Sequence, residues 1–189
     1  MKKAITTVSE IIDSIQKESP IIIAIDGRCA SGKTTLAMEL QKRMDCNVIH
    51  MDHFFLRPEQ RTEERLQTPG ENVDHERFLE EVLEPLREGK KFSYRPYNCQ
   101  LQKLSEPLEI TPKKVAIIEG SYSCHKSLWE YYDARIFLSV EPEEQLRRII
   151  AREGVQKAEI FRDKWIPLEE KYIAFYSLEQ HCDYCFYFS

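Results

Sequence analysis

The chain has 189 residues, 42% of them apolar and 31% charged, and its formal net charge is −5. This length predicts a single globular domain, and the mild acidity argues against a nucleic-acid-binding protein, which needs a basic face. No apolar run approaches the roughly 18 residues of a membrane span, and acidic residues interrupt the segment after the basic start. We therefore expect neither a membrane partner nor a secretion signal. The protein is expected to be cytoplasmic, with its cysteines reduced, and its composition allows a homo-oligomer.

Apolar strands alternate with amphipathic helices along the chain. The spacing of apolar residues predicts a leading helix over 6–18, which Pro20 ends. Strands are expected at 21–25, 48–51, 115–118, 136–140 and 184–188, and further helices at 34–44, 74–88, 143–152 and about 167–179. Such alternation is typical of crossover units, so we predict an α/β fold with a five-stranded, mostly parallel sheet flanked by helices, in one domain over residues 1–189.

Two segments do not fit the alternation of strands and helices. Residues 53–73 are rich in Arg and Glu, and residues 89–112 contain several Pro and Tyr residues with room for short strands. Long segments of this kind in a compact domain are usually functional. Both are therefore candidates for substrate-facing or lid segments.

A phosphate-binding loop is predicted between the first apolar strand and the helix that follows it. The residues Gly27 to Thr34 match G-x-x-x-x-G-K-[ST] at every fixed position, in the expected strand–loop–helix context. The loop's N–H groups and the helix N-terminus would hold phosphates, Lys33 would reach the β- and γ-phosphates, and Thr34 would bind Mg²⁺. We therefore predict ATP and Mg²⁺ as cofactors of a P-loop nucleoside-triphosphate-binding fold. The expected nucleotide-binding residues are Gly27, Arg28, Cys29, Ala30, Ser31, Gly32, Lys33, Thr34 and Thr35.

The motif predicts nucleotide binding but does not by itself specify the reaction. The Asn-Lys-x-Asp element that GTPases use for guanine is missing, and motor ATPases are usually larger or oligomeric. A short single domain with long insertions favours a kinase acting on a small molecule. The alternative is a nucleotide-dependent switch or regulatory ATPase without a small-molecule acceptor.

Three acidic residues directly follow apolar strands, where ligands of open parallel sheets bind. Asp52 is predicted to orient and deprotonate an acceptor hydroxyl, with a capping role as the alternative. Glu119 is predicted to hold Mg²⁺ together with Thr34, with a solvated strand end as the alternative. Asp26 precedes the phosphate loop, and support of the loop backbone is as good an interpretation as direct chemistry.

Arginines after the fourth strand are candidates for stabilising the transferring phosphoryl group. Arg148 and Arg152 are four residues apart and share one helix face, so we expect them in a short lid over about 147–163. Arg147 and Arg162 are further candidates. The alternative is a solvated basic face paired with the neighbouring residues Glu143, Glu144 and Glu153.

These motifs together resemble the uridine kinase and phosphoribulokinase family. The resemblance rests on residues 25–27 with 31–35, on Met51-Asp52-His53-Phe54-Phe55, and on Ile118-Glu119-Gly120-Ser121-Tyr122. It implies that Asp52 is the catalytic aspartate and that Asp74 of the pair Asp74-His75 contacts ribose hydroxyls. From the residues alone, Asp74 is the N-cap of the helix at 75–88, and the two roles are compatible.

The sequence departs from this family in the expected acceptor site. Uridine kinases follow a Tyr-Asp pair with a His and an Arg that hold the pyrimidine nucleoside, whereas residues 97–103 (YNCQLQK) contain neither at that spacing. We expect a small hydroxylated metabolite as acceptor, with nucleosides among the candidates but uridine not the best of them. Pantothenate and nicotinamide riboside are alternatives. The expected substrate-binding residues are Asp74, Tyr94, Arg95 and Tyr97.

Overall fold

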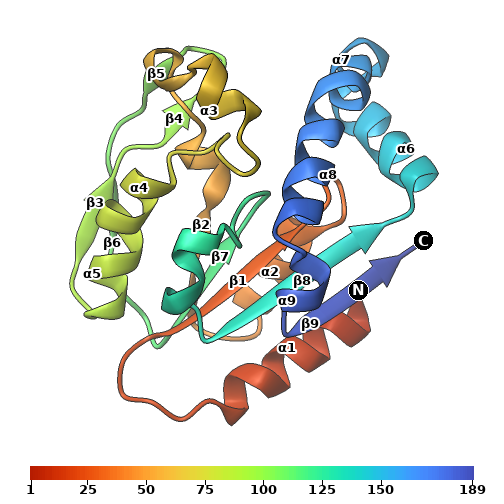
Figure 1. Cartoon of the computed structure of the whole chain (residues 1–189). Helices are drawn as coiled ribbons and strands as arrows, with labels where there is room; N and C mark the ends of the chain where they lie inside the picture. Colours follow the sequence, from red (N-terminus) through yellow and green to blue (C-terminus); the bar gives the residue numbers. More distant parts are fainter.

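The computed structural model describes residues 1–189 and has a central parallel sheet (Figure 1). Its strands are β1 (Ile21–Gly27), β2 (Cys46–His50), β7 (Val115–Glu119), β8 (Ala134–Val140) and β9 (Tyr184–Phe188). They lie in the order β2-β7-β1-β8-β9, and every neighbouring pair is parallel. The predicted five-stranded α/β sheet is thus confirmed, and all of its strands rather than most are parallel. Because β1 lies in the middle, the loop after it is flanked by the ends of β7 and β8.

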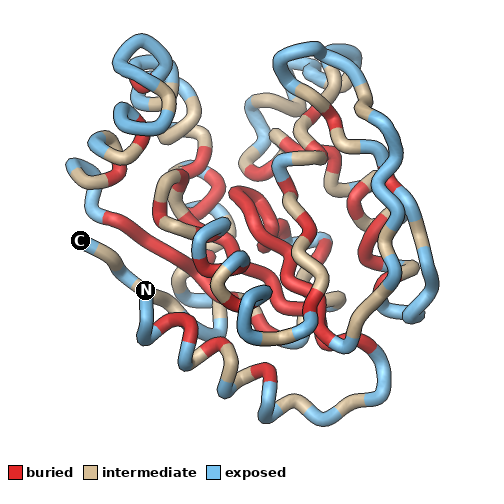
Figure 2. The backbone as a smooth tube through the Cα atoms, turned by 180° about the vertical axis from the view of Figure 1, so that it is seen from behind, coloured by how far each residue is buried: buried red, intermediate tan, exposed pale blue.

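Both faces of the sheet are buried because β1 points alternate side chains into two cores. Ile21, Ile23 and Ile25 pack with the helices α1 (Lys2–Ser14) and α2 (Lys33–Gln41). Ile22 and Ala24 belong to the core on the opposite face. Figure 2 shows the buried backbone running through the central strands and the exposed backbone on the outer helices. Two-sided burial is the reason for the unbroken apolar run in β1.

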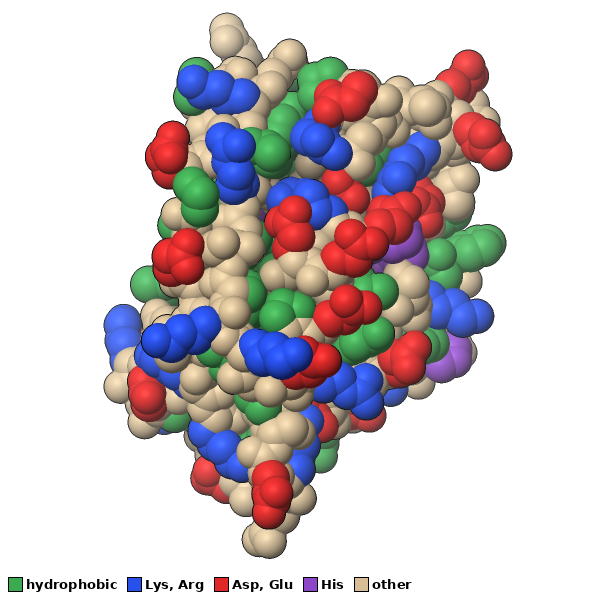
Figure 3. All heavy atoms as spheres, turned by 90° about the vertical axis from the view of Figure 1, so that its left-hand side faces the viewer, with side chains coloured by type: hydrophobic (Ala, Val, Ile, Leu, Met, Phe, Trp, Pro, Cys, Tyr) green, Lys and Arg blue, Asp and Glu red, His purple; other side chains and the backbone are tan.

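A lobe beside the sheet contains both insertions and the helical stretch between them (left in Figure 1). Segment 53–73 contains the helix α3 (Glu63–Gln67), and two short 3-10 turns lie at Met51–Phe54 and Pro58–Gln60. The helical stretch comprises α4 (His75–Phe78), a π turn (Leu79–Leu83) and α5 (Glu84–Arg87). Segment 89–112 forms two antiparallel pairs, β3 (Phe92–Tyr94) with β6 (Leu108–Ile110) and β4 (Tyr97–Asn98) with β5 (Lys103–Leu104). Acidic and basic side chains are intermingled on the face of the molecule in Figure 3.

The chain between β8 and β9 is almost entirely helical. It comprises α6 (Pro142–Glu153), α7 (Val155–Ile160), a π turn (Phe161–Trp165), α8 (Ile166–Phe175) and α9 (Leu178–His181). Gly154 has a φ of +86° and separates α6 from α7 within the segment expected to form the lid. A 3-10 helix (Lys126–Tyr131) precedes β8. None of the helices combines the length and the apolar character that crossing a membrane requires.

Candidate active site

The phosphate-binding loop connects β1 to α2 as predicted. Gly27 has a φ of +132°, and a Cβ at this position would lie 1.9 Å from the carbonyl oxygen of Leu138, so only glycine fits. Gly32, with a φ of +101°, immediately precedes α2. The Lys33 side chain is buried, and its Nζ donates to the carbonyl oxygens of Gly27 (2.8 Å) and Arg28 (2.9 Å). The loop is therefore preorganised around its lysine.

Two observations show that the loop suits a nucleotide with Mg²⁺. The Oγ of Ser31 is buried inside the loop without a hydrogen-bond partner, as expected where a phosphate oxygen can complete the bonding. The Thr34 hydroxyl donates to both carboxylate oxygens of Glu119, at 3.0 and 3.1 Å. Hydroxyl and carboxylate oxygens are the hard donors that Mg²⁺ prefers. The residues present thus fit both groups.

Glu119 ends β7 and is held by a histidine from the neighbouring strand. The Nδ1 of His50 lies 2.5 Å from Oε1 of Glu119, and this hydrogen bond raises the pKa of His50. Register explains the contact, since His50 of β2 lies opposite Glu119 of β7. His53, one turn further, has its pKa lowered to about 4 by burial and by the nearby His50. The Glu119 carboxylate thus favours the protonated form of His50.

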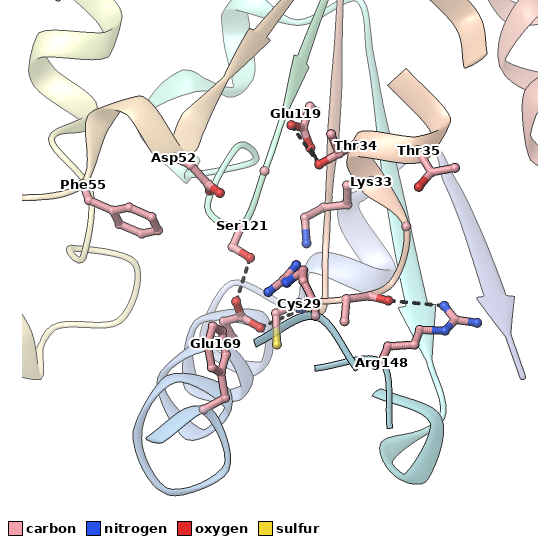
Figure 4. Close-up of a pocket in the computed structure, with 15 residues that line it drawn as sticks. Cys29, Lys33, Thr34, Thr35, Asp52, Phe55, Glu119, Ser121, Arg148 and Glu169 are labelled. Carbon is pink, nitrogen blue, oxygen red and sulfur yellow. Dashed lines mark hydrogen bonds between the residues drawn. The ribbon is translucent and has the colours of Figure 1, made fainter. Parts of the chain in front are cut away.

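Asp52 is the second residue of the 3-10 turn Met51–Phe54 that follows β2, and it faces the same pocket (Figure 4). Gly120 permits this position, because a Cβ there would lie 3.2 Å from Oδ1 of Asp52 and 3.0 Å from Cβ of Met51. The side chain is open to the pocket, yet the surrounding protein partly removes it from water and so raises the pKa of its carboxyl. Lys33 opposes this rise and Glu119 adds to it. A raised pKa makes the carboxylate a better proton acceptor than an exposed one.

The pocket has a volume of about 500 Å³ and collects residues from segments distant in the sequence. Most of the predicted site residues line it, namely Cys29, Ala30, Gly32, Lys33, Thr34, Thr35, Asp52, Glu119, Arg148 and Arg152. Phe55, Gly120, Ser121, Phe161 and Glu169 complete the wall. Figure 4 shows Asp52, Lys33 and Ser121 directed into this space from three different elements. Lys33, the Thr34–Glu119 pair and Asp52 therefore meet in one place, whereas Gly27, Arg28 and Ser31 of the predicted nucleotide-binding set do not line it.

Two residues of the loop have side chains that serve the loop's own structure. The guanidinium of Arg28 donates to Glu170 of α8 (2.7 Å) and to Glu179 of α9 (2.8 Å), so it binds the loop to the C-terminal helices. The thiol of Cys29 is buried, and burial raises its pKa to about 12. An unreactive thiol follows from that environment.

The lid arginines are paired with neighbouring glutamates, and two of them also line the pocket, while their action on a phosphoryl group stays a prediction. Arg148 donates to the carbonyl oxygen of Ala30 in the loop (3.2 Å) and to Glu144 of its own helix (2.6 Å). Arg152 lines the pocket and is paired with the adjacent Glu153 (3.0 Å). Arg147 is 70% exposed and paired with Glu144. Helical pairing thus positions the two arginines that face the pocket, while Arg147 remains outside it.

Asp26 supports the loop backbone, as one of its two interpretations proposed. Its carboxylate accepts hydrogen bonds from the N–H of Gly27 (2.6 Å), the N–H of Cys124 (2.7 Å) and the hydroxyl of Tyr172 (2.8 Å). Burial raises its pKa to about 6 against the effect of these donors. Asp26 does not line the pocket, so its part in the site is to fix the start of the loop.

The sequence interpretation missed Glu169, a buried carboxylate of α8 that reaches the loop. It accepts from the hydroxyl of Ser121 (2.7 Å) and from the N–H of Cys29 (2.9 Å). Glu169 thereby connects α8, the segment after β7 and the phosphate loop (Figure 4). The available signal was its position three residues before Tyr172 and four before Ile173, both buried, which places a charge on the apolar face of the helix.

The four predicted acceptor-binding residues lie outside the pocket wall. Asp74 is buried and accepts from the N–H of Arg77 (3.2 Å), which confirms the predicted N-cap of α4. Tyr94 and Tyr97 are buried in the lobe, and the hydroxyl of Tyr97 has no partner. Arg95 donates to the carbonyl oxygen of Ser105 (2.8 Å) within the lobe. Contact of these residues with an acceptor stays a prediction.

Comparison with known proteins places the chain among P-loop kinases. The family model "Phosphoribulokinase / Uridine kinase family" matches residues 22–163. Uridine-cytidine kinase B of Dictyostelium discoideum is 31% identical over 148 residues, covering 73% of this chain and 60% of that protein. Uridine kinase of Ureaplasma parvum serovar 3 is 30% identical over 149 residues, covering 72% of this chain and 70% of that protein.

A solved structure supports the fold over almost the whole chain. It is described as a possible uridine kinase from Bacillus stearothermophilus and has a TM-score of 0.70, with 19% identity and 98% of both chains covered. At that identity the likeness concerns the fold. The family model, which covers more than half of the sequence, and the curated relatives carry the assignment further. The chain belongs to the phosphoribulokinase/uridine kinase family of small-molecule kinases.

Proposed function

We propose that this chain transfers the γ-phosphoryl group of ATP to a hydroxyl of a small metabolite, with Mg²⁺ as the required cation. The observation that carries the proposal is the meeting of Lys33, the Thr34–Glu119 pair and Asp52 in one pocket. Each group suits one part of such a transfer, and the family assignment agrees with it. A nucleotide-dependent switch would need none of the acceptor chemistry of Asp52, and no observation favours it.

The proposed roles follow from the positions of the side chains. Lys33 and the N–H groups at the start of α2 bind and orient phosphate oxygens. Thr34 and Glu119 supply oxygen ligands for Mg²⁺, which neutralises charge on the phosphates when bound. Asp52 takes the proton from the acceptor hydroxyl. Arg148 and Arg152 place positive charge over the phosphoryl group and exclude water from it.

For the acceptor, we propose a ribosyl or polyol compound with a vicinal diol. The relatives named uridine kinase and uridine-cytidine kinase support a nucleoside, while residues 97–103 lack the family's His and Arg. A site that loses hydrogen-bond partners for a base loses much of its affinity, because the polar edge of the base is then buried unpaired. Uridine is therefore expected to be a poorer acceptor than another compound of this class.

A panel assay of ADP release tests both parts of the proposal. Nucleosides, nicotinamide riboside, pantothenate and sugars are each added with ATP and Mg²⁺. One compound should raise turnover sharply, and kcat/KM for uridine should lie below that of this compound. Slow turnover that no metabolite changes would overturn the kinase proposal. A kcat/KM for uridine above about 10⁴ M⁻¹s⁻¹ and higher than for every other compound would overturn the specificity proposal alone.

A further inference from the structure

A second cluster of polar side chains lies apart from the pocket, where three segments meet. Glu71 comes from segment 53–73, His75 begins α4, and His125 lies in the turn before the 3-10 helix at Lys126–Tyr131. One oxygen and two nitrogen atoms of these residues all lie within 4.8 Å of one another. None of the three lines the phosphate pocket. The proposed kinase chemistry therefore leaves this cluster unexplained.

The two imidazoles present the same ring nitrogen to one carboxylate oxygen. Oε1 of Glu71 lies 3.0 Å from Nε2 of His75 and 3.6 Å from Nε2 of His125. The rings are stacked, with centroids 4.1 Å apart and planes at 13°. The second oxygen of Glu71 lies 3.4 Å from a guanidinium nitrogen of Arg65, which holds the carboxylate in place. Three potential ligand atoms thus lie close together, from one carboxylate and two stacked rings.

The opposite nitrogens of both rings share a single partner. The Oγ of Ser127 lies 2.7 Å from Nδ1 of His125 and 3.2 Å from Nδ1 of His75. The backbone N–H of Ser127 also donates to Nδ1 of His125 at 3.4 Å, so this nitrogen is an acceptor in the structure. Nε2 of His75 in turn donates to Oε1 of Glu71 at 3.0 Å. A bound metal would require both Nε2 atoms to be unprotonated, with the hydrogens on the Nδ1 atoms that face Ser127. A hydroxyl oxygen has two acceptor lone pairs, so Oγ could accept from both Nδ1–H groups once the hydrogens move there. Metal-binding histidines are usually oriented by such a partner on the other nitrogen.

His125 is the most buried member of the cluster. Its side chain is 4% exposed, and its Nε2 forms a long hydrogen bond of 3.5 Å with the hydroxyl of Tyr176. Gly70 closes the loop against the ring, since a Cβ there would lie 2.8 Å from Cδ2 of His125. A hydrogen bond of this length is weak, so a metal ion at Nε2 could take its place.

We propose that Glu71, His75 and His125 form a binding site for a zinc-class divalent transition metal. Imidazole nitrogens with one carboxylate suit Zn²⁺ rather than Mg²⁺, which prefers oxygen ligands. Metal–ligand bonds of about 2.0–2.2 Å in tetrahedral geometry separate ligand atoms by roughly 3.4 Å. The two distances from Glu71 to the histidines bracket that value. Because the stacked rings are nearly parallel, their Nε2 lone pairs point the same way, and binding requires both imidazoles to rotate toward a common point.

Such a metal would join the lobe to the sheet. Its ligands connect segment 53–73 and α4 with the turn after β7, and water would complete the coordination. The inference is independent of the acceptor and of the phosphate-transfer chemistry. Because the folded chain assembles the three ligands, bound metal is also expected to raise thermal stability.

The test uses the full chain, freed of metal with a chelator and then titrated with Zn²⁺ by calorimetry and with Co²⁺ by visible absorption. One equivalent should bind, and Co²⁺ should give the intense bands of a four-coordinate site. Loss of a residue that orients a metal ligand typically weakens metal binding by about 10–100-fold, so Ser127→Ala should weaken Zn²⁺ binding by that factor. Glu71→Gln and His75→Gln remove ligands themselves and should each weaken binding by at least about 100-fold. Circular dichroism confirms that each variant is folded, and Ser127→Ala keeps the test valid should a ligand variant unfold.

His50→Gln and His181→Gln are the matched controls. His50 lies beside Glu119 in the candidate active site, and His181 is an exposed histidine of α9. Both variants should bind Zn²⁺ as the unmodified chain does. The proposal is overturned if the unmodified chain binds no Zn²⁺, if Glu71→Gln and His75→Gln bind it normally, or if only His50→Gln loses it.

Discussion

Replacing Asp52 by Asn removes the carboxylate that we assign to the acceptor hydroxyl while keeping the shape of the side chain. Shape matters here, because Oδ1 of Asp52 lies close to Gly120, at 3.2 Å from the position of an added Cβ. An isosteric amide fits in the same space. If Asp52 is the general base, kcat should fall by about 10²–10⁴, which is roughly 2.7–5.4 kcal/mol of transition-state stabilisation.

The affinity for ATP should change little in Asp52→Asn, because Lys33, Thr34 and Glu119 remain. Coupled ADP release at saturating acceptor measures kcat, and equilibrium dialysis with ATP and Mg²⁺ measures binding. Asp45→Asn is a matched control, since Asp45 is 84% exposed and paired with Lys113 at 2.7 Å. It should leave both values unchanged.

The pH dependence adds a second readout for Asp52. A general base must be deprotonated, so kcat of the unmodified chain should fall as the pH drops through the pKa of Asp52. Burial raises that pKa, so the fall should begin at a higher pH than for an exposed aspartate. Asp52→Asn should lose this limb of the profile. Near-normal kcat in the variant would refute the reasoning and make Glu119 the next candidate.

Three further substitutions test other parts of the site. Lys33→Ala should abolish ATP binding in equilibrium dialysis, and unchanged affinity would contradict the phosphate-loop assignment. The variant should also have a free energy of unfolding lower by about 1–3 kcal/mol, because two carbonyl oxygens lose their donor. Glu169→Leu should weaken ATP binding and lower Tm, because the Ser121 hydroxyl and the Cys29 N–H lose their acceptor. Glu169→Gln can hydrogen-bond both groups, so its ATP affinity and Tm should stay close to those of the unmodified chain. Equal effects of the two variants would show that the charge of Glu169 matters rather than its hydrogen bonds. Tyr97→Phe should leave Tm unchanged, because the Tyr97 hydroxyl has no hydrogen-bond partner. The variant should raise KM for the acceptor if this hydroxyl contacts the acceptor. A large drop in Tm would mean that the hydroxyl is hydrogen-bonded within the protein.

The sheet could be predicted because its signals are local. The apolar runs at 21–25 and 115–118 identify strands buried on both faces, and the glycines with Lys33 identify the loop between β1 and α2. Helix ends were less accurate. The leading helix begins at Lys2 rather than residue 6, because Ala4 and Ile5 extend its buried face, and it ends at Ser14 rather than 18. Helical structure over 155–165 was not predicted, although Val155, Ala158, Phe161 and Trp165 recur at helical spacing there.

Contacts between distant segments were beyond the reach of these signals. Strand order brings His50 against Glu119, and no local pattern encodes the pairing of β2 with β7. Glu169 contacts Cys29 across 140 positions of the chain. The cluster of Glu71, His75 and His125 likewise forms only after folding. Phosphate-binding groups lie within one motif, whereas the groups that position them come from elsewhere in the fold.

Asp74 illustrates why residue type alone left two roles open. Its Oδ1 accepts the capping bond from the N–H of Arg77, and its Oδ2 accepts from the side-chain amide of Gln60 at 2.7 Å. A carboxylate has about four lone-pair sites, so the cap uses only part of its capacity. An acceptor diol could therefore replace Gln60 at Oδ2 without disturbing α4. Because Gln60 belongs to segment 53–73, acceptor binding at Asp74 would require that segment to shift, which makes the insertion part of the specificity and not only of the lobe.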